Sequence, residues 1–159
     1  MPTHYRGSPK QVRALNVYIP LLRAANSLAV RTAAAYEAAG LTVSQFGALE
    51  ALLHLGPLCQ RELGQKLLKS GGNITLVVDN LEKHGWVRRE RRRDDRRMVT
   101  VRLTPAGRRL VARLFPAHAA AVAREMQRLS DSEQDELRRL CRKVGRREET
   151  KPNKKGDRS

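Results

Sequence analysis

One stretch decides the fold: SGGNITLVVDNLEKHGWVRRERRRDDRRMVTVRLTPAG, residues 70–107. Its first half has helical periodicity and stops at Gly85, so it predicts a helix that Ser70 caps. The apolar face of this helix is formed by Ile74, Val77, Val78 and Leu81. After Gly85 the pattern changes to two strands with β-branched residues, WVRRERRR and MVTVRL, separated by a charged turn. Thr104 and Pro105 then fit the N-cap and the first position of another helix.

A shorter helix precedes this stretch, in LCQRELGQKLLKSGG, residues 58–72. Cys59 occupies its N-cap position and Glu62 the capping-box position. Two short helices joined by a tight turn that contains glycine form a helix-turn-helix, and the β-hairpin that follows adds a wing. The predicted fold is mainly α with a small β-hairpin wing: a winged helix-turn-helix with flanking N- and C-terminal dimerisation helices.

The flanking segments divide the chain around this core. We expect a flexible N-terminus at 1–9, an N-terminal dimerisation helix at 10–40, the winged helix-turn-helix DNA-binding lobe at 41–104, C-terminal dimerisation helices at 105–145 and a disordered basic tail at 146–159. Pro20 lies inside the first helix and predicts a kink or two helical pieces. The apolar faces of the flanking helices need a partner, and the simplest is a second copy of the chain, so we expect a homodimer.

The 159 residues carry a formal net charge of +16. Such a basic balance predicts a polyanionic partner, either nucleic acid or an anionic membrane surface. No apolar run approaches the roughly 18 residues of a spanning helix, which disfavours the membrane. The N-terminal residues contain no apolar signal segment, and two distant cysteines, Cys59 and Cys141, suit a reducing compartment. We therefore expect double-stranded DNA as the partner, no membrane, and a location in the cytoplasm on the nucleoid.

No pattern in the sequence indicates an enzyme. The chain has no set of nucleophile, base and acid, no phosphate-binding loop, and no His or Cys pairs at metal-ligand spacing. We therefore expect no catalytic residue, no cofactor and no metal site.

The stretch at 72–110 resembles the MarR family of winged helix-turn-helix regulators. The family pattern T-x-x-V-D-x-L-E-x-x-G-x-V-x-R, followed by D-x-R in the wing and L-T-x-x-G after it, is matched in order and spacing. The matching residues are Thr75, Val78, Asp79, Leu81, Glu82, Gly85, Val87, Arg89, Asp95, Arg97, Leu103, Thr104 and Gly107. Within the family, LTVSQFGALEALLHLGPL, SGGNITLVVDNLE and LFPAH resemble the MhqR-like branch.

This resemblance covers residues 15–145. It implies a homodimer that binds a pseudo-palindromic promoter site, usually as a repressor. It also implies release from DNA by a small aromatic or phenolic ligand or by thiol oxidation.

The predicted recognition helix, 70–84, should place its N-terminal end in the major groove. There Asn73 can pair with adenine, and a methyl group of Thr75 or Leu76 can contact a thymine methyl. The alternative is that Asn73 and Thr75 only support the start of the helix.

The wing, 88–102, supplies the remaining predicted contacts. The resemblance places Arg97 in the minor groove, with Asp95 orienting its guanidinium. The other arginines are either phosphate contacts or a solvated charged face. The predicted DNA-binding set is Ser70, Gly72, Asn73, Thr75, Leu76, Arg89, Arg92, Arg93, Asp95, Arg96 and Arg97.

Two kinds of sensor are compatible with the sequence. Cys59 is the redox candidate, because a helix N-terminus stabilises a reactive thiolate; the alternative is a small residue that fills the N-cap position. For a small aromatic effector the candidates are Tyr18, Arg23, Tyr36 and His54, each of which alternatively belongs to the core or the surface. The histidines, His118 included, are interpreted as surface or satisfied side chains rather than metal ligands.

A second function class fits the composition. A non-specific architectural DNA-binding protein would also carry a large positive charge. It would differ from a regulator in showing little preference for one DNA site.

Overall fold

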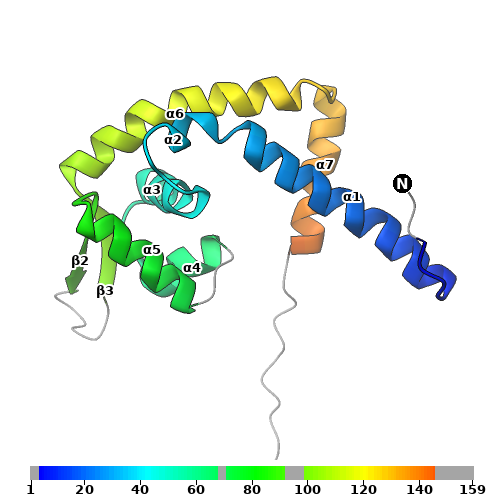
Figure 1. The fold of residues 1–159 in the computed structure, drawn as a ribbon, viewed down its shortest axis with the longest axis horizontal. Helices are drawn as coiled ribbons and strands as arrows, with labels where there is room; N and C mark the ends of the chain where they lie inside the picture. Colours follow the sequence, from blue (N-terminus) through cyan, green and yellow to red (C-terminus); the bar gives the residue numbers. More distant parts are fainter. Residues whose placement is uncertain (1–3, 68–70, 92–98, 146–159) are drawn as a thin grey trace, which may run out of the picture. The chain divides into compact units, whose positions relative to one another are not determined.

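The computed structural model describes residues 4–67, 71–91 and 99–145 (Figure 1). The helices there are α1 Pro9–Arg31, α2 Ala34–Glu37, α3 Val43–Leu55, α4 Gln60–Lys66, α5 Gly71–Lys83, α6 Pro105–Met126 and α7 Asp131–Gly145. The strands are β1 Leu58–Cys59, β2 Val87–Arg91 and β3 Val99–Leu103. The chain forms two compact units, residues 1–123 and 124–159. The mainly helical fold with a small antiparallel sheet confirms the predicted fold class.

The helix-turn-helix consists of α4 and α5, where the sequence predicts it. The Sγ of Cys59 accepts a hydrogen bond from the Glu62 backbone N–H at 3.4 Å, and the Glu62 carboxylate accepts one from the Cys59 N–H at 2.7 Å. These two bonds form the predicted capping box of α4. Gly85, at φ +70°, follows the end of α5 in the left-handed conformation that glycine adopts at little cost. The proposed cap of α5, Ser70, lies outside the described residues.

The wing is an antiparallel hairpin of β2 and β3, with a register that runs from Val87↔Leu103 to Arg91↔Val99. A third strand, β1, pairs with the other edge of β3 and gives the order β1-β3-β2. The sequence does not predict β1, because two residues are too short to show an alternating pattern. Its pairing joins the residue that caps α4 directly to the wing.

The N-terminal helical segment differs from its prediction. Helix α1 continues through Pro20 and stops at Arg31, and the separate helix α2 follows. At the break, the Thr32 hydroxyl donates to the Leu28 carbonyl at 2.8 Å. The break lets Tyr36 turn into the core, where only 3% of it is exposed. The interruption thus follows the burial of an aromatic ring rather than the position of the proline.

The core lies in the first unit, between α2, α3, α4, α5, the sheet and the start of α6. Its largest fully buried side chains are Leu49, Leu52, Leu63, Ile74, Leu81, Val78, Val87, Val101 and Val111. Three of the four residues predicted to face the core from α5 are fully buried, and Val77 packs partly buried against them. This burial confirms the predicted apolar face of α5.

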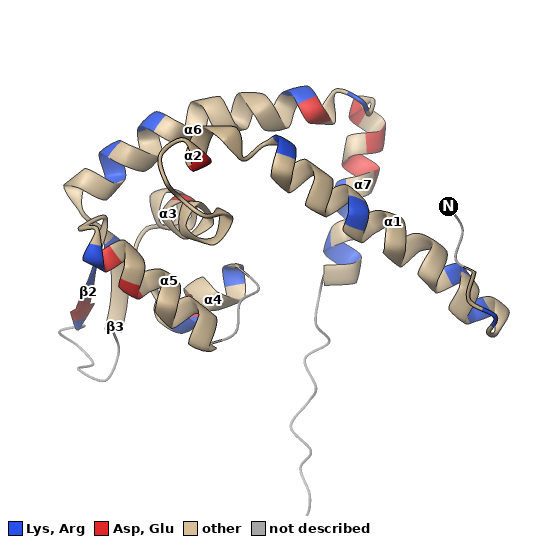
Figure 2. Ribbon diagram, in the orientation of Figure 1, with Lys and Arg blue, Asp and Glu red and all other residues tan. Residues whose placement is uncertain are grey.

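Helix α6 begins at Pro105, and the Thr104 hydroxyl accepts a hydrogen bond from the Gly107 N–H at 3.0 Å, as the sequence predicts. In the second unit, Ser130 and Glu133 form the capping box of α7. Hydrogen bonds from the Ser130 backbone N–H and hydroxyl lower the pKa of Glu133. Acidic residues gather in the first turns of α7 and basic residues in its last turn (Figure 2), which suits the helix dipole.

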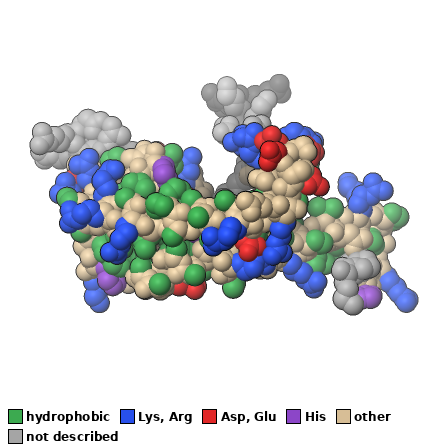
Figure 3. All heavy atoms as spheres, turned by 90° about the horizontal axis from the view of Figure 1, so that it is seen from above, with side chains coloured by type: hydrophobic (Ala, Val, Ile, Leu, Met, Phe, Trp, Pro, Cys, Tyr) green, Lys and Arg blue, Asp and Glu red, His purple; other side chains and the backbone are tan. Residues whose placement is uncertain are grey.

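Helices α1 and α7 leave many of their apolar side chains exposed. Neither helix, as the structure describes it, contains a buried residue. Exposed apolar residues of the two helices are Val17, Tyr18, Leu21, Leu22, Val30, Leu137, Leu140 and Val144. Figure 3 shows hydrophobic side chains at the surface along the part of the molecule that α1 forms at the right of the view. The thiol-bearing residue of α7, Cys141, is also exposed, although its place on the apolar stripe of this helix predicts a core position.

Candidate nucleic-acid interface

The surface of α5 opposite the core carries the predicted DNA-reading side chains. Because Ile74, Val78 and Leu81 point inward, the helical period turns Gly72, Asn73, Thr75 and Leu76 outward, and all four are exposed. Leu76 is an apolar side chain with 64% of its surface exposed. The structure therefore brings four of the predicted residues together on one accessible face.

A hollow of about 340 Å³ adjoins this face. It lies between the first turn of α3 and the outer side of α5, and five of its seven lining residues carry a hydroxyl or amide group. The lining residues are Thr42, Ser44, Gln45, Asn73, Leu76, Val77 and Asn80. Polar groups that can donate or accept hydrogen bonds thus surround the exposed apolar Leu76.

The described part of the wing ends with the pair Arg91 and Val99. Five predicted contacts, Arg92, Arg93, Asp95, Arg96 and Arg97, lie outside the described residues. Nearer the base of the hairpin, the Glu90 carboxylate pairs with Arg88 at 2.6 Å and with Arg102 at 3.0 Å. These side chains come from a cross-strand pair and its neighbour, so they lie on one face of the sheet.

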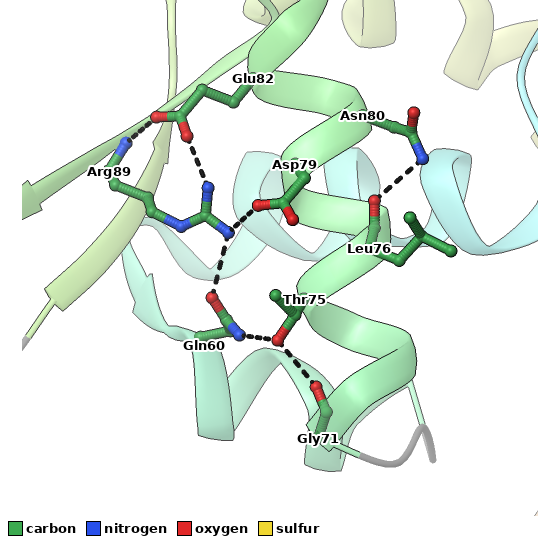
Figure 4. A network of polar contacts seen from close by, with 8 residues as sticks. All are labelled: Gln60, Gly71, Thr75, Leu76, Asp79, Asn80, Glu82 and Arg89. Carbon is green, nitrogen blue, oxygen red and sulfur yellow. Dashed lines mark hydrogen bonds and ion pairs between the residues drawn. The ribbon is translucent and has the colours of Figure 1, made fainter.

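Arg89 points the other way, toward α5, and is held by carboxylates of that helix (Figure 4). Its guanidinium pairs with Asp79 at 2.6 Å and with Glu82 at 2.5 Å, and its backbone N–H donates to Glu82 at 2.8 Å. Asp79 and Glu82 are three residues apart, which places both on the same side of the helix. Only 25% of the Arg89 side chain is exposed. The structure therefore places this predicted DNA contact among partners within the protein.

Burial alone would lower the pKa of Arg89. Its hydrogen bonds to Asp79 and Glu82, together with the charges of these carboxylates, outweigh burial and raise the pKa above the ordinary arginine value. The guanidinium therefore stays charged throughout the accessible pH range. An arginine paired with two carboxylates has little net charge left to attract a phosphate.

Gln60, the first residue of α4, connects Arg89 to Thr75. Its side-chain oxygen accepts from Arg89 at 3.3 Å, and its side-chain nitrogen donates to the Thr75 hydroxyl at 2.6 Å. No sequence pattern singles out Gln60, which is 29 positions from Arg89. Asp79 and Glu82, on one side of α5, were the available signal for the Arg89 contact, because two neighbouring carboxylates attract a cation.

The predicted effector residues differ in exposure and in the neighbours that they contact. Tyr18 and Arg23 are exposed on α1, and Tyr36 is buried with its ring stacked 4.7 Å from Phe46. His54 lies at the far end of α3, with its ring 4.7 Å from that of Phe115. Burial, followed by the charge of Glu37, raises the pKa of Tyr36. The geometry supports the alternative interpretation of Tyr36 as a core residue.

His118 completes the aromatic cluster around Tyr36 and Phe46. Its ring centroid is 4.8 Å from that of Phe46, and its Nδ1 is 3.0 Å from the Thr32 carbonyl oxygen. This histidine is therefore satisfied by the protein, as interpreted from the sequence. Within the ranges that the structure describes, no three His, Cys, Asp or Glu side chains are grouped to hold a metal ion, and no helix could span a membrane.

Comparisons with known proteins agree with this architecture. A model of the MarR family matches residues 39–98. Over 133 residues the chain is 35% identical to the uncharacterized HTH-type transcriptional regulator YkoM of Bacillus subtilis (strain 168). The matched region covers 84% of this chain and 86% of YkoM. It is 32% identical to the HTH-type transcriptional regulator MhqR of the same organism, over 84% and 92% of the two chains.

Solved structures show the same fold. Sco3205, a MarR family transcriptional regulator from Streptomyces coelicolor solved in complex with DNA, superposes with a TM-score of 0.76 at 27% identity, over 89% of each chain. NadR, solved in complex with 4-hydroxyphenylacetate, gives a TM-score of 0.75 at 22% identity, over 93% of this chain and 100% of that one.

Proposed function

Because the chain belongs to the MarR family of transcriptional regulators and is not an enzyme, we propose that it is a site-specific repressor that binds duplex DNA as a homodimer. The observation that carries this proposal is the exposed face of α5, which presents Asn73, Thr75 and Leu76 beside the wing. A recognition helix reads base edges with side chains at its N-terminal half. The relative Sco3205 was solved bound to DNA, which supports the same use of this surface.

In this proposal the N-terminal half of α5 enters the major groove. Asn73 can donate to and accept from one adenine, and Leu76 can contact a thymine methyl group. Gly72 and Ser70 let the helix N-terminus approach a phosphate closely, because hydrogen and a small hydroxyl take little space. The hollow between α3 and α5 leaves room for the sugar-phosphate backbone beside Leu76.

The wing supplies minor-groove and phosphate contacts in the same proposal. Arg97 enters the minor groove and Asp95 orients its guanidinium, while Arg92, Arg93 and Arg96 contact phosphates. Two copies of this arrangement, related by a two-fold axis, would read half-sites about 10 bp apart. The uncovered apolar residues of α1 and α7 support the two-fold partner.

A small aromatic or phenolic compound is the effector class we propose for release from DNA. NadR has this fold and was solved with 4-hydroxyphenylacetate. Oxidation of Cys59 is the second route. Its thiol sits in the N-cap of α4 and its backbone pairs with β3, so a bulkier oxidised sulfur would disturb both elements.

The net charge of +16 favours a second candidate, an architectural protein that binds any duplex. Fluorescence anisotropy separates the two functions. Labelled duplexes of about 30 bp from DNA flanking the gene, and scrambled versions, are titrated at several salt concentrations.

A regulator is expected to prefer its own site by about 1,000-fold or more. If each subunit neutralises about four phosphates, the dimer's slope of log K against log salt is near −7. Equal binding to the flanking, scrambled and randomised duplexes would support the architectural function instead.

A further inference from the structure

The Thr75 hydroxyl is already used inside the protein. It donates to the Gly71 carbonyl at 2.9 Å and accepts from the Gln60 side-chain nitrogen at 2.6 Å (Figure 4). A hydroxyl has a single proton and two lone pairs. Its proton is therefore committed to the carbonyl one turn earlier in α5, and one lone pair is committed to α4.

Arg89 decides which end of Gln60 faces Thr75. A guanidinium only donates hydrogen bonds, so Gln60 must turn its carbonyl oxygen toward Arg89. The amide nitrogen then faces Thr75 and donates to its hydroxyl oxygen. That bond favours the rotamer in which the Thr75 proton points back to Gly71. A substitution at Arg89 would remove this orientation of the amide.

Arg89 is itself held more firmly than a surface arginine. It makes two ion pairs with carboxylates of α5, one hydrogen bond to Gln60 and one backbone bond to Glu82. These contacts run from β2 to α5 and, through Gln60, to α4. Strand β2 of the wing is thereby connected to the outward-facing side chain of Thr75 on α5.

We propose that Arg89 is a positioning residue rather than a DNA contact, and that through Gln60 it keeps the Thr75 hydroxyl within the protein, so that Thr75 reads DNA through its methyl group. The inference rests on the proposed function, in which α5 lies in the major groove. A methyl group there recognises the C5-methyl group of thymine, whereas a hydroxyl would bond to polar base edges. Thr75 therefore selects thymine at one position of each half-site.

The test uses two variants of the full-length protein that each keep half of the threonine side chain. Thr75→Val keeps the methyl group and the branched shape, and we expect operator affinity within about three-fold of the parent. Thr75→Ser keeps the hydroxyl, and we expect a loss of about ten-fold, because the dimer loses two methyl contacts. Replacing each operator thymine by uracil locates the methyl that Thr75 contacts.

At that position uracil should weaken binding by the parent and by Thr75→Val, but not by Thr75→Ser, which has no methyl group to lose the contact. The opposite pattern, in which Thr75→Val loses the site and Thr75→Ser keeps it, overturns the inference while site-specific binding still stands. A parent protein with no preferred duplex contradicts the proposed function itself, and with it this inference.

The role of Arg89 has its own readout. Arg89→Gln should leave the salt dependence of binding unchanged but lower the ratio of operator to scrambled affinity by about ten-fold, with partial rescue by Arg89→Lys. A phosphate contact would instead reduce the salt slope by about one per subunit at an unchanged ratio, and that result overturns the positioning role. Arg88→Gln, on the other face of β2, is the matched control. If Arg89→Gln does not fold, the ratio of operator to scrambled affinity is measured for Arg89→Lys. A lower ratio than that of the parent supports the positioning role, and an unchanged ratio overturns it.

Discussion

At the scale of single residues, Gly107 has no room for a side chain. A Cβ built there would lie 1.9 Å from the Trp86 carbonyl oxygen, and that carbonyl is held in place by the Thr104 N–H at 3.0 Å. Backbone on both sides of the contact would have to move. We expect Gly107→Ala to lower the free energy of unfolding by about 3 kcal/mol, measured by urea denaturation.

Gly72→Ala is the matched control, because a Cβ at Gly72 meets no atom within 4 Å. Alanine in the first turn of α5 should leave the free energy of unfolding equal or higher by about 0.5 kcal/mol. Equal destabilisation by the two substitutions would show that loss of glycine flexibility, rather than the contact with Trp86, is responsible.

At the scale of elements, Thr104 joins the wing to α6. Its hydroxyl donates to the Gly85 carbonyl at 2.7 Å and accepts from the Gly107 N–H at 3.0 Å, so one side chain connects the end of α5, the end of β3 and the start of α6. We expect Thr104→Val to lower the free energy of unfolding by about 1–2 kcal/mol, which is measured as a lower thermal midpoint of unfolding. Thr104→Ser keeps the hydroxyl and should stay close to the parent; a similar fall for both variants would assign the effect to packing of the methyl group.

At the scale of the whole molecule, the uncovered helices α1 and α7 predict self-association. Exposed leucines in both should lie at the interface, so we expect a dimer in sedimentation equilibrium at micromolar concentration, and a shift toward monomer for Leu22→Glu or Leu140→Glu. Leu55→Glu, an exposed leucine at the end of α3, is the control that should stay dimeric. A monomeric parent protein would contradict the homodimer.

Much of the fold could be predicted from short-range patterns. The buried face of α5, the capping box that starts at Cys59 and the start of α6 after Thr104 all depend on residues within about four positions of one another. Helical periodicity and capping act over that range, so the sequence alone determined these elements. The exposed positions Asn73 and Leu76 followed from the same period.

Only the tertiary structure decided which of these side chains remain available to a partner. The break after α1 at Thr32 rather than at Pro20, the two-residue strand β1 and the contact between Arg89 and Gln60 depend on chain segments that the fold brings together. The run of arginines in the sequence does not show that one of them, Arg89, forms ion pairs with Asp79 and Glu82. An ion pair needs a distance of a few ångströms, and for residues seven and ten positions apart on a helix and a strand, packing of the core sets that distance.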